Sequence, residues 1–141
     1  MLYQVPALGG IPKKLLVDIH TPVTFSPDGK KFAFVRVSQN EEEGVLMIAN
    51  ADGSGEQKLA SRAGYDWFSY SGPAWSPDGK VIASGAGSPR GMTVVTVGVE
   101  DGAQREFTAS KWSNVETVAW LADGSGLVLN AAERGTHSKQ L

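Results

Sequence analysis

The stretch TFSPDGKKFAFV, Thr24 to Val35, returns fifty residues later as AWSPDGKVIASG, Ala74 to Gly85, and again as AWLADGSGLVLN, Ala119 to Asn130. Each copy has an aromatic residue, then a tight-turn sequence, then an apolar run. The aromatic residues are spaced 50 and 45 residues apart, as Phe25, Trp75 and Trp120. Self-similarity at a period of about 40 to 50 residues is typical of repeat architectures, so the chain is expected to repeat one structural unit.

The repeated turn has a physical mechanism. Pro27 fixes the φ angle at the second turn position. Asp28 tolerates the backbone conformation of the third position, and Gly29 accepts a positive φ. The third copy lacks the proline, so we expect a looser turn there. The residues expected to build these turns are Pro27, Asp28, Gly29, Pro77, Asp78, Gly79, Asp123 and Gly124.

A second turn recurs between the copies. NADGSGEQKLA, Asn50 to Ala60, matches GVEDGAQREFT, Gly98 to Thr108, and PALGGIPKKLL, Pro6 to Leu16, is a shorter version. Each full unit therefore contains two hairpin turns and four short segments, and the segments become more polar from the first to the fourth. This pattern predicts an all-β fold of four-stranded antiparallel blades, which is the signature of a β-propeller.

The composition supports a globular domain and excludes several partner classes. Hydrophobic residues make up 41% and charged residues 20%, and 17 glycines and 7 prolines are spread along the chain. With a net charge of −2, the chain lacks the excess of basic residues that nucleic-acid binding requires. No apolar run is long enough for membrane insertion. The chain has no cysteine for disulfides, and its start, MLYQVPALGG, lacks the features of a signal peptide.

The stretches FSPDGKKFAFV and WSPDGKVIASG resemble the WD-like propeller repeat of the TolB type. Similar repeats occur in propeller domains of prolyl oligopeptidases and in the extracytoplasmic part of bacterial receptor-like Ser/Thr kinases. The resemblance covers nearly the whole chain and implies a segment of a larger bacterial propeller protein with a periplasmic or extracytoplasmic location. The motif residues serve the hairpin, so they say little about function.

The repeats divide a single propeller segment, residues 1–141, into about three blade equivalents. We expect a half-blade of third and fourth strands at 1–20, complete blades at 21–61 and 72–110, and a half-blade of first and second strands at 115–133. Two copies exchanging half-blades could close a six-bladed ring, so a homodimer is predicted. A higher oligomer, closure within one chain and a longer parent protein remain alternatives.

The chain shows no sign of catalytic or metal chemistry. His20 lies in a connector and His137 in a polar tail, and no Gly-x-Ser-x-Gly nucleophile motif occurs. The alternating oxygens from Asn50 to Glu56 weakly resemble a calcium loop, but the recurrence of Asp-Gly at 101–102 without them favours a hairpin. We therefore predict no enzyme activity, no metal and no cofactor.

The connectors opposite the tight turns are the candidate binding region. The longest contains GYDWFSYS, Gly64 to Ser71, and the next contains SKWSN, Ser110 to Asn114. Aromatic side chains with polar tips near a ring mouth suit an unknown protein, a peptide or a small ligand. The alternative is that these rings fill the spaces between neighbouring blades. The candidate residues are Tyr65, Asp66, Trp67, Tyr70, Arg90, Lys111 and Trp112.

Two functions follow from this pattern. The first is a non-catalytic scaffold or sensor segment that binds proteins or small ligands. The second is the gating propeller portion of a prolyl oligopeptidase-like serine peptidase, which would require an α/β-hydrolase domain with a nucleophile motif downstream.

Overall fold

A computed structural model describes residues 1–40, 42–107 and 112–135, and all regular structure in these ranges is β-strand. The strands in chain order are β1 (Leu2–Gln4), β2 (Lys13–Leu16), β3 (Thr24–Phe25), β4 (Lys31–Val37), β5 (Glu43–Asn50), β6 (Gln57–Ala63), β7 (Trp67–Phe68), β8 (Ala74–Trp75), β9 (Val81–Ser88), β10 (Gly91–Gly98), β11 (Gln104–Glu106), β12 (Trp112–Trp120) and β13 (Leu127–Glu133). In these ranges, no helix is long and apolar enough to cross a membrane.

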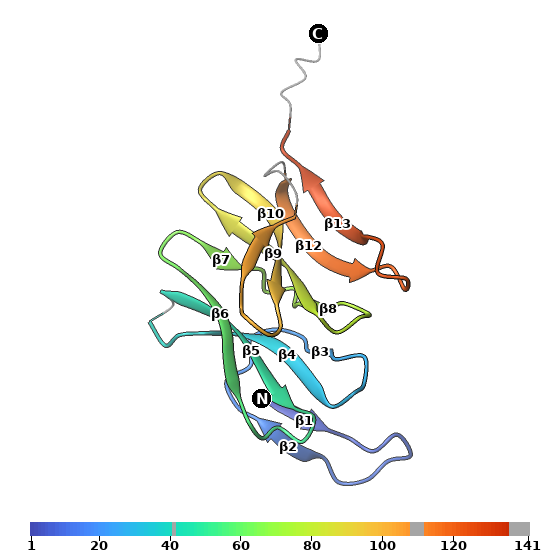
Figure 1. The fold of residues 1–141 in the computed structure, drawn as a ribbon. Coiled ribbons are helices and arrows are strands. Elements are labelled where there is room, and N and C mark those ends of the chain that lie inside the picture. Colours follow the sequence, from blue (N-terminus) through green and yellow to red (C-terminus); the bar gives the residue numbers. More distant parts are fainter. Residues whose placement is uncertain (41, 108–111, 136–141) are drawn as a thin grey trace.

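The strands form two complete antiparallel blades flanked by two half-blades (Figure 1). Blade 1 has the order β3-β4-β5-β6. Blade 2 uses β7 and β8 together as its first strand, because both pair with β9, and continues through β10 to β11. The N-terminal half-blade is β1-β2, and the C-terminal half-blade is β12-β13. The pair Met92–Trp112 also connects β10 to β12, so the C-terminal half-blade and blade 2 share one hydrogen-bonded sheet. The predicted all-β fold of four-stranded blades is confirmed.

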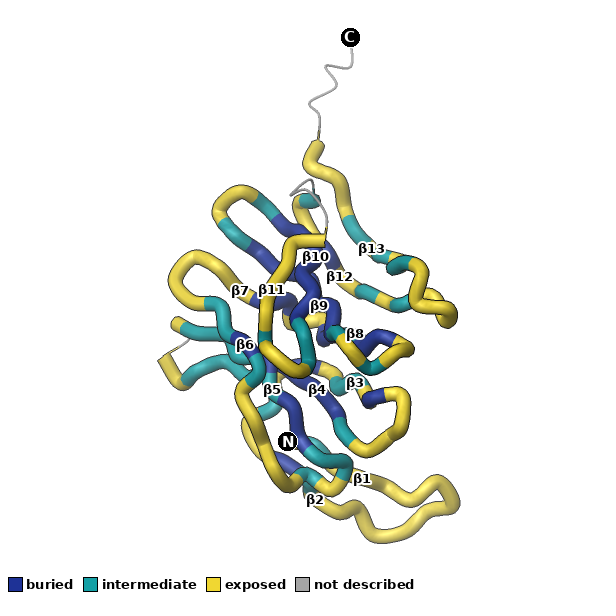
Figure 2. Tube along the Cα trace, in the orientation of Figure 1, coloured by how far each residue is buried: buried dark blue, intermediate teal, exposed yellow. Residues whose placement is uncertain are grey.

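The blades stack face to face, and each junction has its own apolar core. The N-terminal half-blade meets blade 1 through Leu16, Phe32, Phe34 and Ala49. A second cluster, which includes Trp75, joins blade 1 to blade 2. The third cluster joins blade 2 to the C-terminal half-blade. Burial is therefore deepest in the inner strands of the complete blades, and the two half-blades at the ends of the stack are the most exposed (Figure 2).

The three inner hairpin turns share one backbone geometry. The N–H groups of Gly29, Gly79 and Gly124 donate to the carbonyl three residues earlier at 2.9, 3.0 and 2.9 Å, with φ of 70°, 75° and 73°. The expected looser third turn is therefore wrong. Asp123 accepts hydrogen bonds from the N–H and hydroxyl of Ser125, as Asp28 and Asp78 each accept one N–H and one hydroxyl in their own turns.

The turn carboxylates are stabilised in their ionised form. The Lys30 N–H and then the Ser26 hydroxyl lower the pKa of Asp28. At Asp78 the order is reversed, and the Ser76 hydroxyl is the larger cause of the lowered pKa. Hydrogen bonds to the charged form favour ionisation even at these exposed positions.

Acid should destabilise the protein through these turns. Because the folded pKa of Asp28, Asp78 and Asp123 lies below the unfolded value of about 3.9, the unfolded chain binds protons first. Their stabilisation is complete above that value and is lost as the pH falls through the folded pKa. We expect the melting temperature to decrease as the pH is lowered from about 5 to about 3. In the Asp78→Asn variant this decrease should be smaller. An equal slope in the variant would contradict this origin.

The structure corrects the expected boundaries of two connectors. Trp67 and Phe68 belong to β7 and pair with Gly87 and Ala86 of β9, although the sequence placed them in a loop before residue 72. Phe68 is 2% exposed, and its burial in the core between blades 1 and 2 explains the extra strand. Trp112 likewise begins β12 and is not in a loop.

Candidate binding face

The alternation of strands places the Asp-Gly turns on one side of the stack and the other connections between strands on the opposite side. The connector face carries the β4-β5, β6-β7 and β9-β10 connections. Two polar hollows and a narrow cavity lie along it. We call them the inner hollow, the outer hollow and the bridging cavity.

The inner hollow has a volume of about 460 Å³ and lies where the first strands of blades 1 and 2 approach. The segment before β3, the end of β4 and the first strand of blade 2 each contribute to its wall. Its lining residues are Asp18, His20, Arg36, Val37, Ser38, Gln39 and Tyr70.

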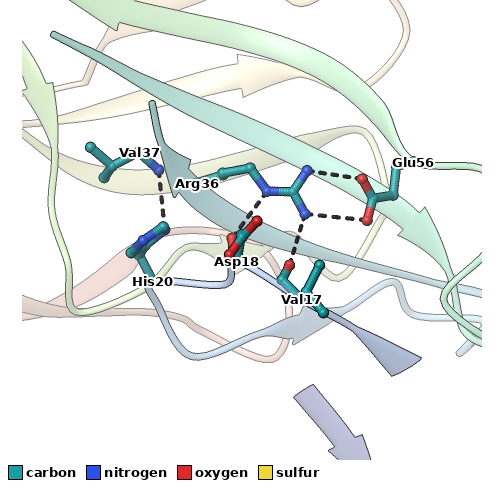
Figure 3. Close-up of polar contacts among 6 residues, drawn as sticks. All are labelled: Val17, Asp18, His20, Arg36, Val37 and Glu56. Atoms are coloured by element: carbon teal, nitrogen blue, oxygen red, sulfur yellow. Dashed lines mark hydrogen bonds and ion pairs between the residues drawn. The ribbon is translucent and has the colours of Figure 1, made fainter. Parts of the chain in front are cut away.

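Arg36 fixes one wall of the inner hollow (Figure 3). Its Nη1 and Nη2 donate to the Glu56 carboxylate at 2.9 and 3.2 Å, and its Nε and Nη2 donate to the carbonyls of Asp18 and Val17 at 3.0 and 3.1 Å. The Glu56 hydrogen bond raises the pKa of Arg36, and Arg36 lowers the pKa of Glu56. The guanidinium is therefore a structural clamp on the segment between β2 and β3.

His20 is held by β4. The Val37 N–H donates to His20 Nδ1 at 3.2 Å. The His20 N–H in turn donates to the Val35 carbonyl at 3.3 Å. His20 thus presents a fixed, exposed ring beside the inner hollow and has one nitrogen left for a ligand.

The outer hollow, of about 240 Å³, lies between blades 1 and 2 and is lined by Arg62, Asp66, Ser88, Pro89, Arg90 and Glu106. Arg62 lies 5.9 Å from the Phe68 ring centroid and 4.0 Å from the Asp66 carboxylate. Among the described residues, Arg62 Nε is buried without a hydrogen-bond partner. The hollow therefore holds cationic and anionic groups in close proximity.

The bridging cavity connects the two hollows into one row. It has a volume of about 60 Å³. Tyr70 lines both this cavity and the inner hollow, whereas Asp66 lines both this cavity and the outer hollow. An extended ligand lying across the connector face would therefore meet aromatic, cationic and carboxylate groups in turn.

The predicted site residues divide between surface and packing positions. Tyr65 and Tyr70 are 83% and 57% exposed, and Asp66 and Arg90 line the outer hollow. Trp67 lies against Gly87, where a β-carbon would overlap its indole.

Trp112 is half-buried, pairs with Met92, and packs into the core beneath the C-terminal half-blade. Lys111 lies outside the described residues, as does His137. Sequence reasoning missed Arg62 and Arg36, because a charged residue at the end of a predicted strand is usually a solvated side chain. The groups that these two arginines contact are either distant in the sequence or backbone atoms. No local sequence pattern reveals such contacts.

In the described ranges, no group of three or more His, Asp or Glu side chains is placed to hold a metal ion. The oxygens of the calcium-like loop are engaged, since Asp52 accepts from Ser54 and Glu56 from Arg36. A further hollow of about 630 Å³ lies on the turn side, and its lining residue Asp78 likewise bonds within its own hairpin.

Comparison with solved structures places the fold. The chain superimposes on a protein of Agrobacterium tumefaciens assigned as TolB with a TM-score of 0.75 and 22% identity, over 93% of this chain and 45% of that one. For TolB from Acinetobacter baumannii the TM-score is 0.71 at 18% identity, over 90% of this chain and 31% of that one. The fold is that of a TolB-type β-propeller.

The TolB-type fold is also shared with a protease. The β-propeller domain of the trilobed protease from Pyrococcus furiosus matches with a TM-score of 0.57 and 18% identity, over 77% of this chain and 33% of that one. The chain thus spans less than half the length of each of these three structures. No protein-family model and no curated protein sequence matches the chain significantly.

Proposed function

We propose that this protein is a non-catalytic scaffold or sensor segment that binds an extended peptide or a protein loop across its connector face. The row formed by the inner hollow, the bridging cavity and the outer hollow carries this proposal. Tyr70 stands between the first two, and Arg90 lines the last. Exposed tyrosine and arginine side chains are the types that dominate interface energies.

The chemistry of the row favours a peptide with charges of both signs. The outer hollow offers Arg62 and Arg90 to a carboxylate, and Asp66 and Glu106 to a basic group. The inner hollow adds the Tyr70 ring and the free nitrogen of His20. The resemblance to TolB-type repeats also supports a periplasmic or extracytoplasmic site of action, which stays a prediction.

A selection from a random peptide library on the immobilised chain tests this function. We expect the selected peptides to bind Tyr70→Ala and Arg90→Ala at least about tenfold more weakly, because truncating a central tyrosine or arginine costs more than about 1.4 kcal/mol. Lys80→Ala, on the turn side, is the matched control and should bind normally. Peptides that lose affinity only for the Lys80 variant would refute the connector face as the site.

The alternative function is the gating propeller of a serine peptidase. The structural match to the propeller domain of a protease supports this alternative. In that case the chain would accompany a hydrolase domain. Mass spectrometry of the selected peptides after incubation with the chain should show no cleavage under either reading. The parent gene separates them, because only the peptidase reading requires a downstream nucleophile motif.

A further inference from the structure

We infer that the two half-blades are recognition surfaces for each other, and that a second copy of this chain joins β13 to β1 in one defined register. In the described residues, the outer edges of β1 and β13 have no strand partner. They lie at opposite ends of the stack, so one copy does not bring them together (Figure 1). Unpaired edges of this kind template pairing with another strand.

The repeat fixes which positions of β13 correspond to buried strands. The N–H groups of Ser26, Ser76 and Leu121 all donate to the carbonyl five residues later at 2.9 Å, so the three inner hairpins superimpose residue by residue. Val128 is therefore equivalent to Ala33 and Ala83. Those two residues are 0% exposed, whereas Val128 is 58% exposed. Position Val128 thus lacks the neighbour that the complete blades have.

The same comparison between repeats shows that β1 is equivalent to the third strand of a blade. The Gly9 N–H donates to the Pro6 carbonyl at 3.0 Å, as the Gly53 N–H donates to Asn50 at 2.8 Å. Tyr3 pairs with Lys14 as Met47 pairs with Lys58, and both pairs follow a register shift. Val5, 59% exposed, is then equivalent to Ala49, which is 0% exposed. In the described residues, β1 and β2 therefore correspond to the third and fourth strands of a blade.

The register follows from blade 1. There the second and third strands pair Ala33 with Ile48. Their equivalents in the half-blades are Val128 and Gln4, so Val128 of one copy should lie opposite Gln4 of the other. Two copies related by a two-fold axis would form this pairing twice and close a ring of six blades.

Two further positions, Gly9 and Phe107, lack in one copy a contact that the ring would supply. At the junction of β2 with blade 1, a β-carbon at Gly53 would lie 2.6 Å from the Leu15 carbonyl oxygen, so the outer turn rests on the fourth strand of the preceding blade. The equivalent turn glycine of the N-terminal half-blade, Gly9, has open space around it. The equivalent fourth-strand residue of blade 2, Phe107, is 51% exposed. A second copy would bring Gly9 and Phe107 together.

Phe25 gives an independent indication. It occupies the repeat position of Trp75, yet Phe25 is 55% exposed and Trp75 is 8% exposed. Trp75 belongs to one buried cluster with Ala33 and Ile48 of the preceding blade. In the ring, Val128 of the second copy would lie beside Gln4 and complete the equivalent cover over Phe25.

Mass measurement and crosslinking of the 141-residue chain test the inference. We expect a species of twice the 14.9 kDa chain mass in light scattering. Val128→Lys should weaken dimerisation by about 100-fold or more, because it places an unpaired charge in each junction. Tyr65→Lys, an equivalent change on the connector face, should leave the dimer intact. A folded monomer or a larger assembly of the unchanged chain would overturn the proposal.

The absence of cysteine makes the register directly testable. The double variant Gln4→Cys/Val128→Cys should oxidise to a covalent dimer. Gln4→Cys/Ala132→Cys should not, because four residues along a strand add about 13 Å, beyond the reach of a disulfide. Equal crosslinking of both pairs, or a crosslink within one chain, would overturn the proposed register.

Discussion

Replacing Trp75 with alanine should lower the free energy of unfolding by about 3–5 kcal/mol, the range for removing a large aromatic side chain from a core. Trp75 is 8% exposed and belongs to the cluster that joins blades 1 and 2. Its Nε1 donates to the Gly79 carbonyl at 3.1 Å, so the ring also supports the turn that follows it. The substitution would leave a cavity at the central junction and free that carbonyl.

Urea unfolding followed by circular dichroism measures this loss, and the repeat supplies a matched control. Phe25 holds the same repeat position but is 55% exposed, so Phe25→Ala should cost about 1 kcal/mol or less at concentrations where the chain is a monomer. If a second copy covers Phe25, that cost should rise with protein concentration. Equal losses for the two variants in the monomer would show that burial does not set their contributions.

The turns could be predicted because their determinants are local. Asp28 bonds to Ser26 and Lys30, each two residues away, so the sequence SPDG contains nearly everything the hairpin needs. The order of strands then followed from the recurrence of the turns. The third turn shows the limit of this reasoning, because the Ser125 hydroxyl supplies the bond to Asp123 that Ser26 and Ser76 supply in the other two turns, so the motif is not preserved.

The first strand of blade 2 could not be predicted because it is interrupted. β7 and β8 both pair with β9, and the Ser69 N–H still donates to the Gly85 carbonyl, but residues 70–73 depart from the ladder, with Gly72 at φ 95° and Pro73 lacking an N–H. This bulge breaks the alternation on which strand prediction depends. The stretch from Gly64 to Ser71 therefore reads as a loop, although Phe68 is in the core.

The candidate binding site stays a prediction, and the hollows of the connector face are lined by only some of the residues that the sequence singles out. Tyr70, Asp66 and Arg90 were singled out because aromatic and charged residues in long connectors suit binding. The clamp formed by Arg36 was not, since its partner Glu56 is twenty residues away and its other partners are backbone carbonyls. Only the packed sheet brings these groups together.

Gly102→Ala should lower the free energy of unfolding by about 2–5 kcal/mol, from two separable causes. Gly102 has φ 68°, a region that costs a residue with a β-carbon about 1–2 kcal/mol. A β-carbon there would also overlap the carbonyl oxygen of Leu59 in the outer strand of blade 1. Relieving that overlap means moving backbone against backbone, for which overpacking costs about 1–3 kcal/mol.

Gly29→Ala separates the two causes. Gly29 has nearly the same φ, 70°, but nothing lies within 4 Å of its β-carbon position. It should therefore show only the conformational cost, of about 1–2 kcal/mol in urea unfolding. The difference between the variants measures how rigidly the outer turn of blade 2 rests on blade 1. If both variants lose the same free energy, the blades can separate slightly at their outer edges, and stability must reside in the inner cores.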